Sequence, residues 1–377
     1  MADILRTRPD GYQEVKTGLG WRKVLSPTSS EATTQLPVID ISNGSHPDLE
    51  RRKAVAKDVC NAAIKTGFFY ISNHGVPDST VGTIFDETKR FFRELTLEEK
   101  MEFDTEKHEH YYGYYPIKLD PKQPAGSSEF LLSLWKCWLI MAELNESINY
   151  GYEPSADPNA ADQQNNGDNW WPLEDRLPGY ETEVKSYMSE VLRLSRRLLR
   201  LFALGLDLEE HAFDYLATRP YSILKLAHYP GTLPGTEEPS SIRPHTDYEI
   251  LTILLQDDIP SLEVLSNTGQ WIQAKPIPGT FVVNIGDTLA MLTNGLFSST
   301  MHRVRNTSQR GRYSVPFFFG ANQEAVIKAL DTCVTPENPA KFQPMTSGDY
   351  IRRSLQGVYS KPHTEIVYET IEIQAQG

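Results

Sequence analysis

The spacing of hydrophobic positions divides the chain into a helical first part and a strand-rich second part. Apolar side chains recur every three or four residues over 48–66, 77–94 and 181–205, which is the period of a helix that buries one face. Between residues 222 and 320 the apolar runs are short, rich in β-branched residues and separated by turns, as in buried strands. The pattern predicts helices before residue 210 and a mainly β core after it.

Capping and turn residues refine these boundaries. Gly67 ends the first helix. Thr96 and Glu99 form a capping-box signature that opens a short helix. The apolar run 288–292 is interpreted as one of the strands of the second part, and a C-terminal helix is predicted to begin at Ser347.

A histidine–aspartate pair in the strand-rich part is the strongest chemical signal. His245 and Asp247 are two residues apart on an extended segment, so their side chains project to the same face. His302 follows after several predicted strands, which is enough chain to fold back and bring a second imidazole to the pair. Two imidazoles and one carboxylate can hold Fe(II) on one face and leave the opposite positions open, as in non-haem iron oxygenases.

An arginine and a serine on a later strand point to a ligand for those open positions. The run 312–319 alternates, which places Arg312 and Ser314 on one side of the strand. A guanidinium group can form paired, charge-assisted hydrogen bonds to an entering carboxylate. In the simpler structural interpretation His302 caps a strand and Arg312 forms a salt bridge, but that interpretation does not explain why all these elements occur in this order.

Other histidines with ligand-like spacing are better explained by local structure. His46 and Asp48 precede a predicted helix, and the Ser, Pro and Asp around them are typical of a helix start. His108 and His110 stand in a charged segment that is interpreted as a solvated loop. The pair within 363–365 has no further histidine or cysteine after it.

The composition argues against several classes of function. Among 377 residues, 37 basic and 50 acidic side chains give a formal charge of −13, and no basic cluster suggests nucleic-acid binding. Three cysteines far apart (Cys60, Cys137 and Cys333) favour a reducing compartment over a disulfide framework. The N-terminus lacks the apolar core of a signal peptide, and the apolar run 130–141 is too short to span a bilayer. We expect a cytoplasmic monomer that binds neither nucleic acid nor membranes.

In its motifs the chain resembles the iron(II)/2-oxoglutarate-dependent oxygenases, in their isopenicillin N synthase-like branch. The similar segments of the catalytic core are 226–230, 244–247, 251–257, 281–287, 293–295, 301–304 and 312–314. Residues 36–41 and 67–76 are similar to the N-terminal domain of that family, so the resemblance covers 36–360.

The resemblance implies an α+β fold. Residues 222–320 should form a double-stranded β-helix, or jelly roll, with an N-terminal helical domain packed on it. The helix at 181–205 should back the larger sheet. The expected regions are an N-terminal arm on the surface (1–35), an N-terminal dioxygenase-type domain with helices (36–210), a catalytic jelly-roll core (211–330), and a C-terminal helix and tail (331–377).

The resemblance also implies roles for individual residues. The implied iron ligands are His245, Asp247 and His302. Arg312 and Ser314 would bind the distal carboxylate of 2-oxoglutarate, with Tyr229 as a further hydrogen-bond donor. The implied cofactor and cosubstrates are Fe(II), 2-oxoglutarate and O2.

The implied reaction is the oxidation of an unactivated C–H bond in a small organic molecule, with release of succinate and CO2. Hydroxylation, desaturation or ring rearrangement, in specialised metabolism, would all be compatible with it. The protein's part is to bind and orient the reactants and to exclude water. Two alternatives stay open: an Fe(II) oxidase of the same fold whose Arg-x-Ser pair holds the substrate instead of 2-oxoglutarate, and a non-catalytic jelly roll that binds a small molecule.

The sequence departs from the family pattern in two places. Relatives often carry asparagine where this chain has Ala227, and the neighbouring His228 is expected to point away from Tyr229, into the core. The apolar run 130–141 replaces a polar loop. It is either a helix that lines the substrate entrance or a translated intron in a faulty gene model. His74 belongs to a family motif without a catalytic role, and we interpret it as structural.

Overall fold

The central element of the fold is an eight-stranded sheet. The computed structural model describes residues 4–8, 12–26, 28–30, 32–107, 112–117, 145–161, 168–232 and 240–359. In spatial order the strands of this sheet are β4 (Val38–Asp40), β5 (Phe68–Ser72), β13 (Thr280–Ile285), β10 (Leu251–Gln256), β15 (Arg312–Phe319), β8 (Ser222–Tyr229), β7 (Glu146–Tyr150) and β6 (Gly113–Tyr115). Neighbouring strands are antiparallel except for β4 and β5.

A four-stranded antiparallel sheet faces the eight-stranded one. Its strands in spatial order are β12 (Trp271–Gln273), β11 (Leu262–Leu265), β14 (His302–Asn306) and β9 (Ser240–His245). Apolar side chains fill the space between the sheets: one cluster joins β5 and β13 to β11, and another joins β8 to β14 and β9. The two packed sheets form the predicted jelly roll, and the fold prediction is confirmed.

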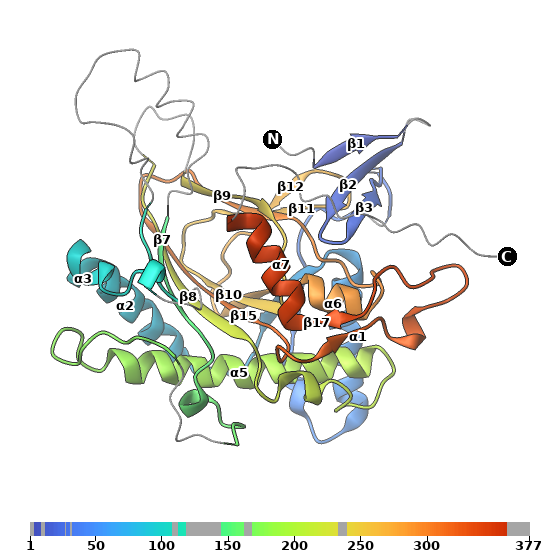
Figure 1. The fold of residues 1–377 in the computed structure, drawn as a ribbon. Helices are drawn as coiled ribbons and strands as arrows, with labels where there is room; N and C mark the ends of the chain where they lie inside the picture. The colour runs from blue at the N-terminus through green and yellow to red at the C-terminus, as the bar shows by residue number, and fades with distance from the viewer. Residues whose placement is uncertain are drawn as a thin grey trace, which may run out of the picture.

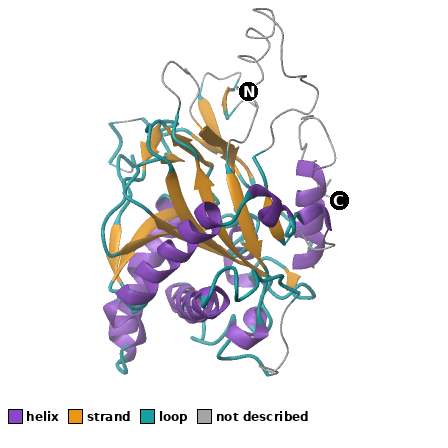
Figure 2. Cartoon of the chain, turned by 90° about the vertical axis from the view of Figure 1, so that its left-hand side faces the viewer, coloured by secondary structure: helices purple, strands orange, loops and turns teal. Residues whose placement is uncertain are grey.

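Helices cover the other face of the eight-stranded sheet (Figures 1 and 2). The longest are α1 (Leu49–Lys65), α2 (Asp78–Glu94) and α5 (Tyr180–Gly205). The apolar stripe of α5 is fully buried, for example at Val184 and Leu198, and α5 packs against α1, α2, β10 and β15. The helix predicted at 181–205 therefore backs the larger sheet, as expected.

The helix boundaries follow from the capping residues that the sequence indicates. Asp48 accepts a hydrogen bond from the backbone N–H of Glu50 at 3.0 Å and so caps α1. Gly67, which follows α1, has φ +67°, and a Cβ there would lie 2.0 Å from the carbonyl oxygen of Ser298. Only glycine fits this approach between α1 and the chain before β14. The capping box at Thr96 is also present, and it opens α3 (Leu97–Met101).

The short element α6 corrects one prediction. Residues interpreted as a strand at 288–292 form a helix, Asp287–Leu292, in which every side chain is buried. A fully apolar run has no periodicity that separates a buried strand from a buried helix. Leucine, alanine and methionine favour the helix.

The N-terminal region contains more structure than the sequence indicated. Within the expected arm, β1 (Leu5–Thr7), β2 (Gln13–Thr17) and β3 (Gly20–Lys23) form a small antiparallel sheet. It packs through Val15 onto Leu265 and Met301 beside the four-stranded sheet. The arm is therefore an ordered covering of the jelly roll.

The C-terminal part adds a two-stranded sheet and one helix. They are β16 (Val326–Ile327), β17 (Met345–Thr346) and α7 (Ser347–Tyr359). Five short 3-10 turns complete the described elements: η1 (Ser42–Ser45), η2 (Thr105–Lys107), η3 (Pro154–Ala156), η4 (Asp214–Ala217) and η5 (Asp331–Cys333). None of the helices in the described ranges is long and apolar enough to cross a membrane.

Some expectations are not tested by this structure. The run 130–141, the pair His108 and His110, and residues 363–365 lie outside the described residues. The division into regions at residues 35, 210 and 330 stays a prediction. Strands from 36–210 share the eight-stranded sheet with strands from 211–330, so the two regions are joined by continuous hydrogen bonding.

Candidate metal centre

The two histidines of the predicted triad meet across a pair of antiparallel strands. His245 is the last residue of β9, His302 is the first of β14, and the two are direct partners in the strand register. Their ring centroids lie 4.2 Å apart. Asp247 follows β9 by two residues, and its Oδ1 lies 3.7 Å from His245 Nε2 and 3.6 Å from His302 Nε2.

This group is compact enough for one metal ion. The ligand atoms of its three members lie within 4.8 Å of one another, and no other group of three or more such side chains occurs in the described part of the chain. Asp247 and His302 are buried, while His245 is partly exposed. The donor set matches the two-histidine, one-carboxylate arrangement that suits Fe(II).

Backbone carbonyl groups orient both imidazoles. His245 Nδ1 lies 2.7 Å from the carbonyl oxygen of Arg243, and His302 Nδ1 lies 3.2 Å from that of Thr300. Because a carbonyl oxygen only accepts, each Nδ1 must carry the proton. Each Nε2 then keeps its lone pair for a metal ion, which is the usual arrangement of a ligating histidine.

Two side chains from neighbouring strands fix the carboxylate. Thr252 on β10 and Asn284 on β13 donate to Asp247 Oδ2 at 2.5 and 2.8 Å, which leaves Oδ1 facing the histidines. These partners were missed by the sequence analysis, although both interrupt otherwise apolar strands. A polar residue in a buried strand is the signal that could have found them.

The protonation states of the group favour metal binding. Burial opposes ionisation of Asp247, but the nearby imidazoles and the two hydrogen bonds outweigh it and lower its pKa. Burial, together with the neighbouring His245, lowers the pKa of His302 to about 4. At neutral pH the carboxylate is therefore charged and the imidazole neutral, as a metal requires.

Two further buried carboxyl groups lie behind the triad. The backbone N–H of Asp287 donates to the carbonyl oxygen of Asp247 at 2.8 Å, and Asp287 Oδ2 accepts from the hydroxyl of Tyr350 on α7 at 2.8 Å. Burial and the charge of Asp247 raise the pKa of Asp287 to about 6 and that of Glu249 to about 8.

Arg312 is a fully buried cation that forms no ion pair within the described structure, although the charge of the nearby Asp257 acts on it electrostatically. It is 1% exposed. Its Nη1 donates to Ser314 Oγ at 3.2 Å and its Nη2 to Gln256 Oε1 at 3.4 Å, while its Nε has no partner. The nearby Asp257 already accepts the backbone N–H groups of Tyr313 and residue 259. A buried guanidinium without an anion is costly, so this position calls for an anionic ligand.

The surroundings of Arg312 place it in the same inter-sheet space as the triad. Its guanidinium lies over the ring of Tyr229, 4.9 Å from the centroid. Tyr229 in turn packs against Ile242 on β9 and Val304 on β14, the two strands that carry the histidines. The structure thus brings together the residues that the sequence singled out for the metal and for the carboxylate.

His228 shows a polar environment that the sequence did not indicate. As expected it points to the opposite side from Tyr229, where its ring packs on the core residues Phe92 and Tyr313, but it also meets a carboxylate there. Its Nδ1 lies 2.8 Å from Glu146 Oε1, and its ring stacks on Tyr313 with 4.7 Å between centroids. Glu146 also accepts from Lys100. The expectation is corrected because Glu146, on the neighbouring strand β7, offers a carboxylate directly opposite His228.

Two family models match the chain in the regions just described. Residues 220–321 match the 2OG-Fe(II) oxygenase superfamily, and residues 36–174 match the family described as non-haem dioxygenase in morphine synthesis N-terminal. The chain belongs to the Fe(II)/2-oxoglutarate-dependent oxygenases, as its motifs had implied. It is a dioxygenase that uses Fe(II), 2-oxoglutarate and O2.

Individual relatives are similar over most of the chain. The 2-oxoglutarate-Fe(II) type oxidoreductase ppzC of Metarhizium majus is 33% identical over 89% of this chain and 90% of its own length. The 2-oxoglutarate-Fe(II) type oxidoreductase hxnY of Emericella nidulans is 33% identical over 88% and 92%. The crystal structure of full-length Neurospora crassa T7H with alpha-KG and thymine has a TM-score of 0.74 and 27% identity over 86% of this chain and 97% of that one. These findings favour the 2-oxoglutarate-dependent enzyme over both alternatives.

Proposed function

We propose that His245, Asp247 and His302 hold the Fe(II) of this dioxygenase. The observation that carries the proposal is the convergence of one carboxylate oxygen and two imidazole Nε2 atoms within 4.8 Å. The Nδ1–H bonds to backbone carbonyls and the anchored Oδ2 of Asp247 hold these atoms in place before metal arrives. Such preorganisation is what a ligand shell needs to bind metal tightly.

We further propose that Arg312, Ser314 and Tyr229 hold 2-oxoglutarate. The guanidinium fork pairs with the distal carboxylate, and the hydroxyl of Ser314 donates a further hydrogen bond. Bound Fe(II) and 2-oxoglutarate supply, with O2, the oxidising chemistry of the reaction, and the cosubstrate leaves as succinate and CO2. The protein orients the cosubstrate and keeps water away from a site enclosed between two sheets.

The proposed substrate is a small organic molecule that loses hydrogen from an unactivated C–H bond. Hydroxylation, desaturation and ring rearrangement are all outcomes of such a reaction, and we place it in specialised metabolism. The presence of thymine in the structure of the similar Neurospora protein supports a small-molecule substrate. We also propose a cytoplasmic monomer that does not bind nucleic acid or membranes, and the formal charge of −13 supports the part of this proposal that concerns nucleic acid.

A turnover screen tests the proposal. The protein is purified without oxygen, loaded with Fe(II) and offered 2-oxoglutarate, O2 and a panel of small metabolites. Succinate release and product mass are measured together, since a true substrate gives one oxidised product for each succinate. Failure of the folded protein to bind Fe(II) would overturn the assignment of the ligands. Size-exclusion chromatography and cell fractionation test the monomer and the cytoplasmic location.

A further inference from the structure

A cavity of about 590 Å³ lies in the helical layer, away from the candidate metal centre. It is bordered by α5, by α1, and by the segments 44–47 and 74–76. Two glutamates and five arginines line it; the arginines are Arg52, Arg193, Arg196, Arg197 and Arg200. This arginine cavity is unexpected in a chain whose formal charge is −13.

The arginines of α5 form a stripe along one face of the helix. Arg193, Arg197 and Arg200 are spaced by four and three residues, so their side chains are neighbours on the helix surface. Like charges at this spacing repel and destabilise a helix. Either carboxylates of the protein offset that repulsion, or a bound anionic ligand does.

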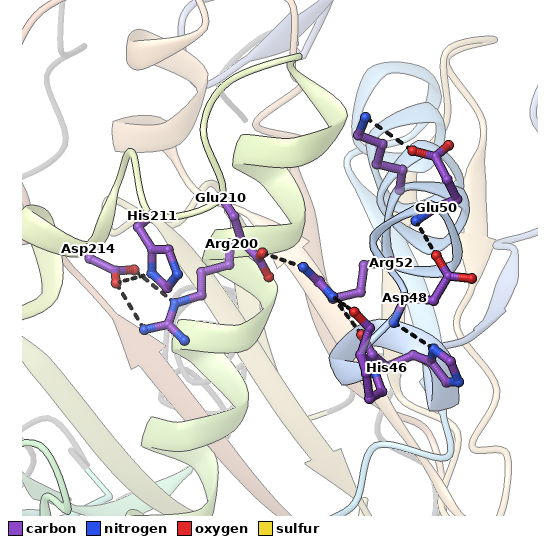
Figure 3. Close-up of polar contacts among 10 residues, drawn as sticks. His46, Asp48, Glu50, Arg52, Arg200, Glu210, His211 and Asp214 are labelled. Atoms are coloured by element: carbon purple, nitrogen blue, oxygen red, sulfur yellow. Dashed lines mark hydrogen bonds and ion pairs between the residues drawn. The ribbon is translucent and has the colours of Figure 1, made fainter.

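Carboxylates offset four of the five arginines. The ion pairs are Arg52 with Glu210 at 2.8 Å, Arg193 with Glu190 at 2.5 Å, Arg196 with Asp157 at 2.6 Å, and Arg200 with Asp214 at 2.9 Å. In Figure 3 the side chain of Glu210 lies between Arg200 and Arg52, and Asp214 holds Arg200 from the other side. These carboxylates are therefore committed to particular partners.

Arg197 is the arginine that remains. Its Nη2 donates to the carbonyl oxygen of His74, its Nε is buried without a hydrogen-bond partner, and no ion pair joins it to a carboxylate of the described residues. Burial lowers the pKa of Arg197, and burial followed by the charge of Arg197 lowers the pKa of His74. The positive charge at this point is thus felt by its neighbours but not neutralised.

We propose that the arginine cavity binds a phosphate group carried by a small molecule, with Arg197 as the principal contact. Guanidinium groups reach the cavity from two helices, and donors that converge from several directions suit the tetrahedral oxygens of phosphate better than a planar carboxylate. The volume of about 590 Å³ exceeds what a phosphate ion needs and falls in the range of small-molecule sites.

The cavity is separate from the site of the oxygenase reaction. The α1 and α5 helices lie on the face of the eight-stranded sheet that is opposite the four-stranded sheet (Figures 1 and 2). The triad lies between the two sheets. A phosphate in the arginine cavity therefore occupies a second site, and its binding can be measured while the first site is filled.

Calorimetric titration of the full chain tests the proposal. The protein is kept without oxygen and saturated with Fe(II) and 2-oxoglutarate, so that Arg312 is not available to a second anion. The titrants are inorganic phosphate and glucose 6-phosphate, with glucose as the uncharged control. We expect saturable binding at one site per chain for the phosphates and none for glucose. Added salt should weaken the binding, because the site is partly open to solvent.

Substitutions locate the binding. Arg197→Gln removes the uncompensated charge and should raise the dissociation constant about 10-fold to 100-fold, because it removes hydrogen bonds between charged groups. Arg197 also donates a hydrogen bond to the carbonyl oxygen of His74, so its substitution could disturb the local structure. A second variant avoids this difficulty: Asn159→Asp adds a carboxylate at an exposed position that lines the cavity, and it should also weaken phosphate binding. Arg352→Gln removes an exposed arginine of α7 that does not line the cavity, and it should bind as the parent does.

The outcomes separate the possibilities. Tighter binding of glucose 6-phosphate than of inorganic phosphate would show that the cavity recognises a phosphate ester, whereas equal affinity would show that the phosphate group alone is recognised and the sugar adds nothing. Both results support a phosphate site. No binding of either titrant to the parent protein would overturn the proposal. So would equal loss of binding in all three variants, or unchanged binding in folded Arg197→Gln and Asn159→Asp.

Discussion

Arg312 and Arg197 both lack a carboxylate partner among the described residues, but their surroundings differ. Arg312 is fully enclosed between two sheets and contacts neutral groups. Arg197 is partly buried on a helix and stands among arginines that are already paired. Because electrostatic attraction grows as the effective dielectric falls, an anion at Arg312 should be held more strongly and more selectively than one at Arg197.

Under the two proposals, enclosure divides two binding tasks within one fold. The strands fix Arg312 beside the triad, where a single cosubstrate of defined shape is required. The helical layer leaves an open cavity of about 590 Å³, where size and shape restrict the ligand less. Because the eight-stranded sheet separates the two sites, we expect a substitution in one site to leave ligand binding at the other unchanged.

The largest effect is expected when a metal ligand is removed. His302→Ala should abolish succinate release and sharply weaken Fe(II) binding, because only two ligands remain, while phosphate binding in the arginine cavity persists. Iron content after anaerobic purification, succinate release and circular dichroism are measured together. His211→Ala is the matched control, since that exposed histidine lies in the helical part and is paired with Asp214. Full activity in His302→Ala would remove the central claim.

Exchange of Arg312 should have the next largest effect. Arg312→Lys keeps the charge but not the planar fork. We expect the apparent KM for 2-oxoglutarate to rise about 30-fold to several thousand-fold, the range expected when a charge-assisted hydrogen bond is removed from a desolvated site. Iron binding should hardly change. Arg310→Lys, two residues earlier and exposed beside Asp258, should behave as the parent protein. Similar KM values for both variants would contradict the role of Arg312.

Local spacing explains why much of the iron centre could be predicted from the sequence. Residues two apart on a strand share a face, so His245 and Asp247 could be placed together from their positions alone. His302 and Arg312 were found through strand order and family resemblance. The side chains that support Asp247 depend on strand pairing, which local sequence does not reveal. Thr252 stands out as a polar residue in an apolar strand, but the local sequence does not show that its partner is Asp247.

Long-range packing explains the remaining differences. Residues 288–292, which belong to the helix Asp287–Leu292, were interpreted as a strand because so short and largely apolar a run has no readable period. The arginine cavity was not predicted at all. Arg52 and Arg197 come from helices far apart in sequence, and nothing in the local sequence distinguishes either from a surface arginine. Glu190 and Arg193 are close enough in sequence to be paired on a helix, but the pairing of Glu210, Asp157 and Asp214 with their arginines became visible only in three dimensions.

A smaller effect is expected from substitution of Thr252, which orients the ligand Asp247. Thr252→Val keeps the shape of the side chain but removes the hydroxyl that donates to Asp247 at 2.5 Å. Iron affinity should fall about 10-fold to 100-fold, as for other groups that orient a ligand. Anaerobic Fe(II) titration measures it. Thr280→Val, at the partly exposed start of β13, provides the control. Equal iron affinity in the two variants would show that Asn284 alone suffices to orient Asp247.

The smallest effect should come from Ser314, and it sharpens the comparison between the two arginines. Ser314 is 1% exposed and its hydroxyl lies 3.2 Å from Arg312 Nη1, so it can add one neutral hydrogen bond to whatever Arg312 binds. Ser314→Ala removes that bond but leaves the guanidinium and the strand intact. The apparent KM for 2-oxoglutarate should rise about 2-fold to 10-fold, which is the usual size of one neutral hydrogen bond.

The readout for Ser314→Ala is a 2-oxoglutarate titration followed by succinate release, with Ser308→Ala as a control outside the inter-sheet space. Iron affinity and phosphate binding should match the parent protein, because Ser314 contacts neither the triad nor the arginine cavity. A raised KM for the organic substrate, with an unchanged KM for 2-oxoglutarate, would instead mean that Arg312 and Ser314 hold the substrate. In that case Arg312 would still bind a carboxylate, but the carboxylate would belong to the organic substrate and not to 2-oxoglutarate.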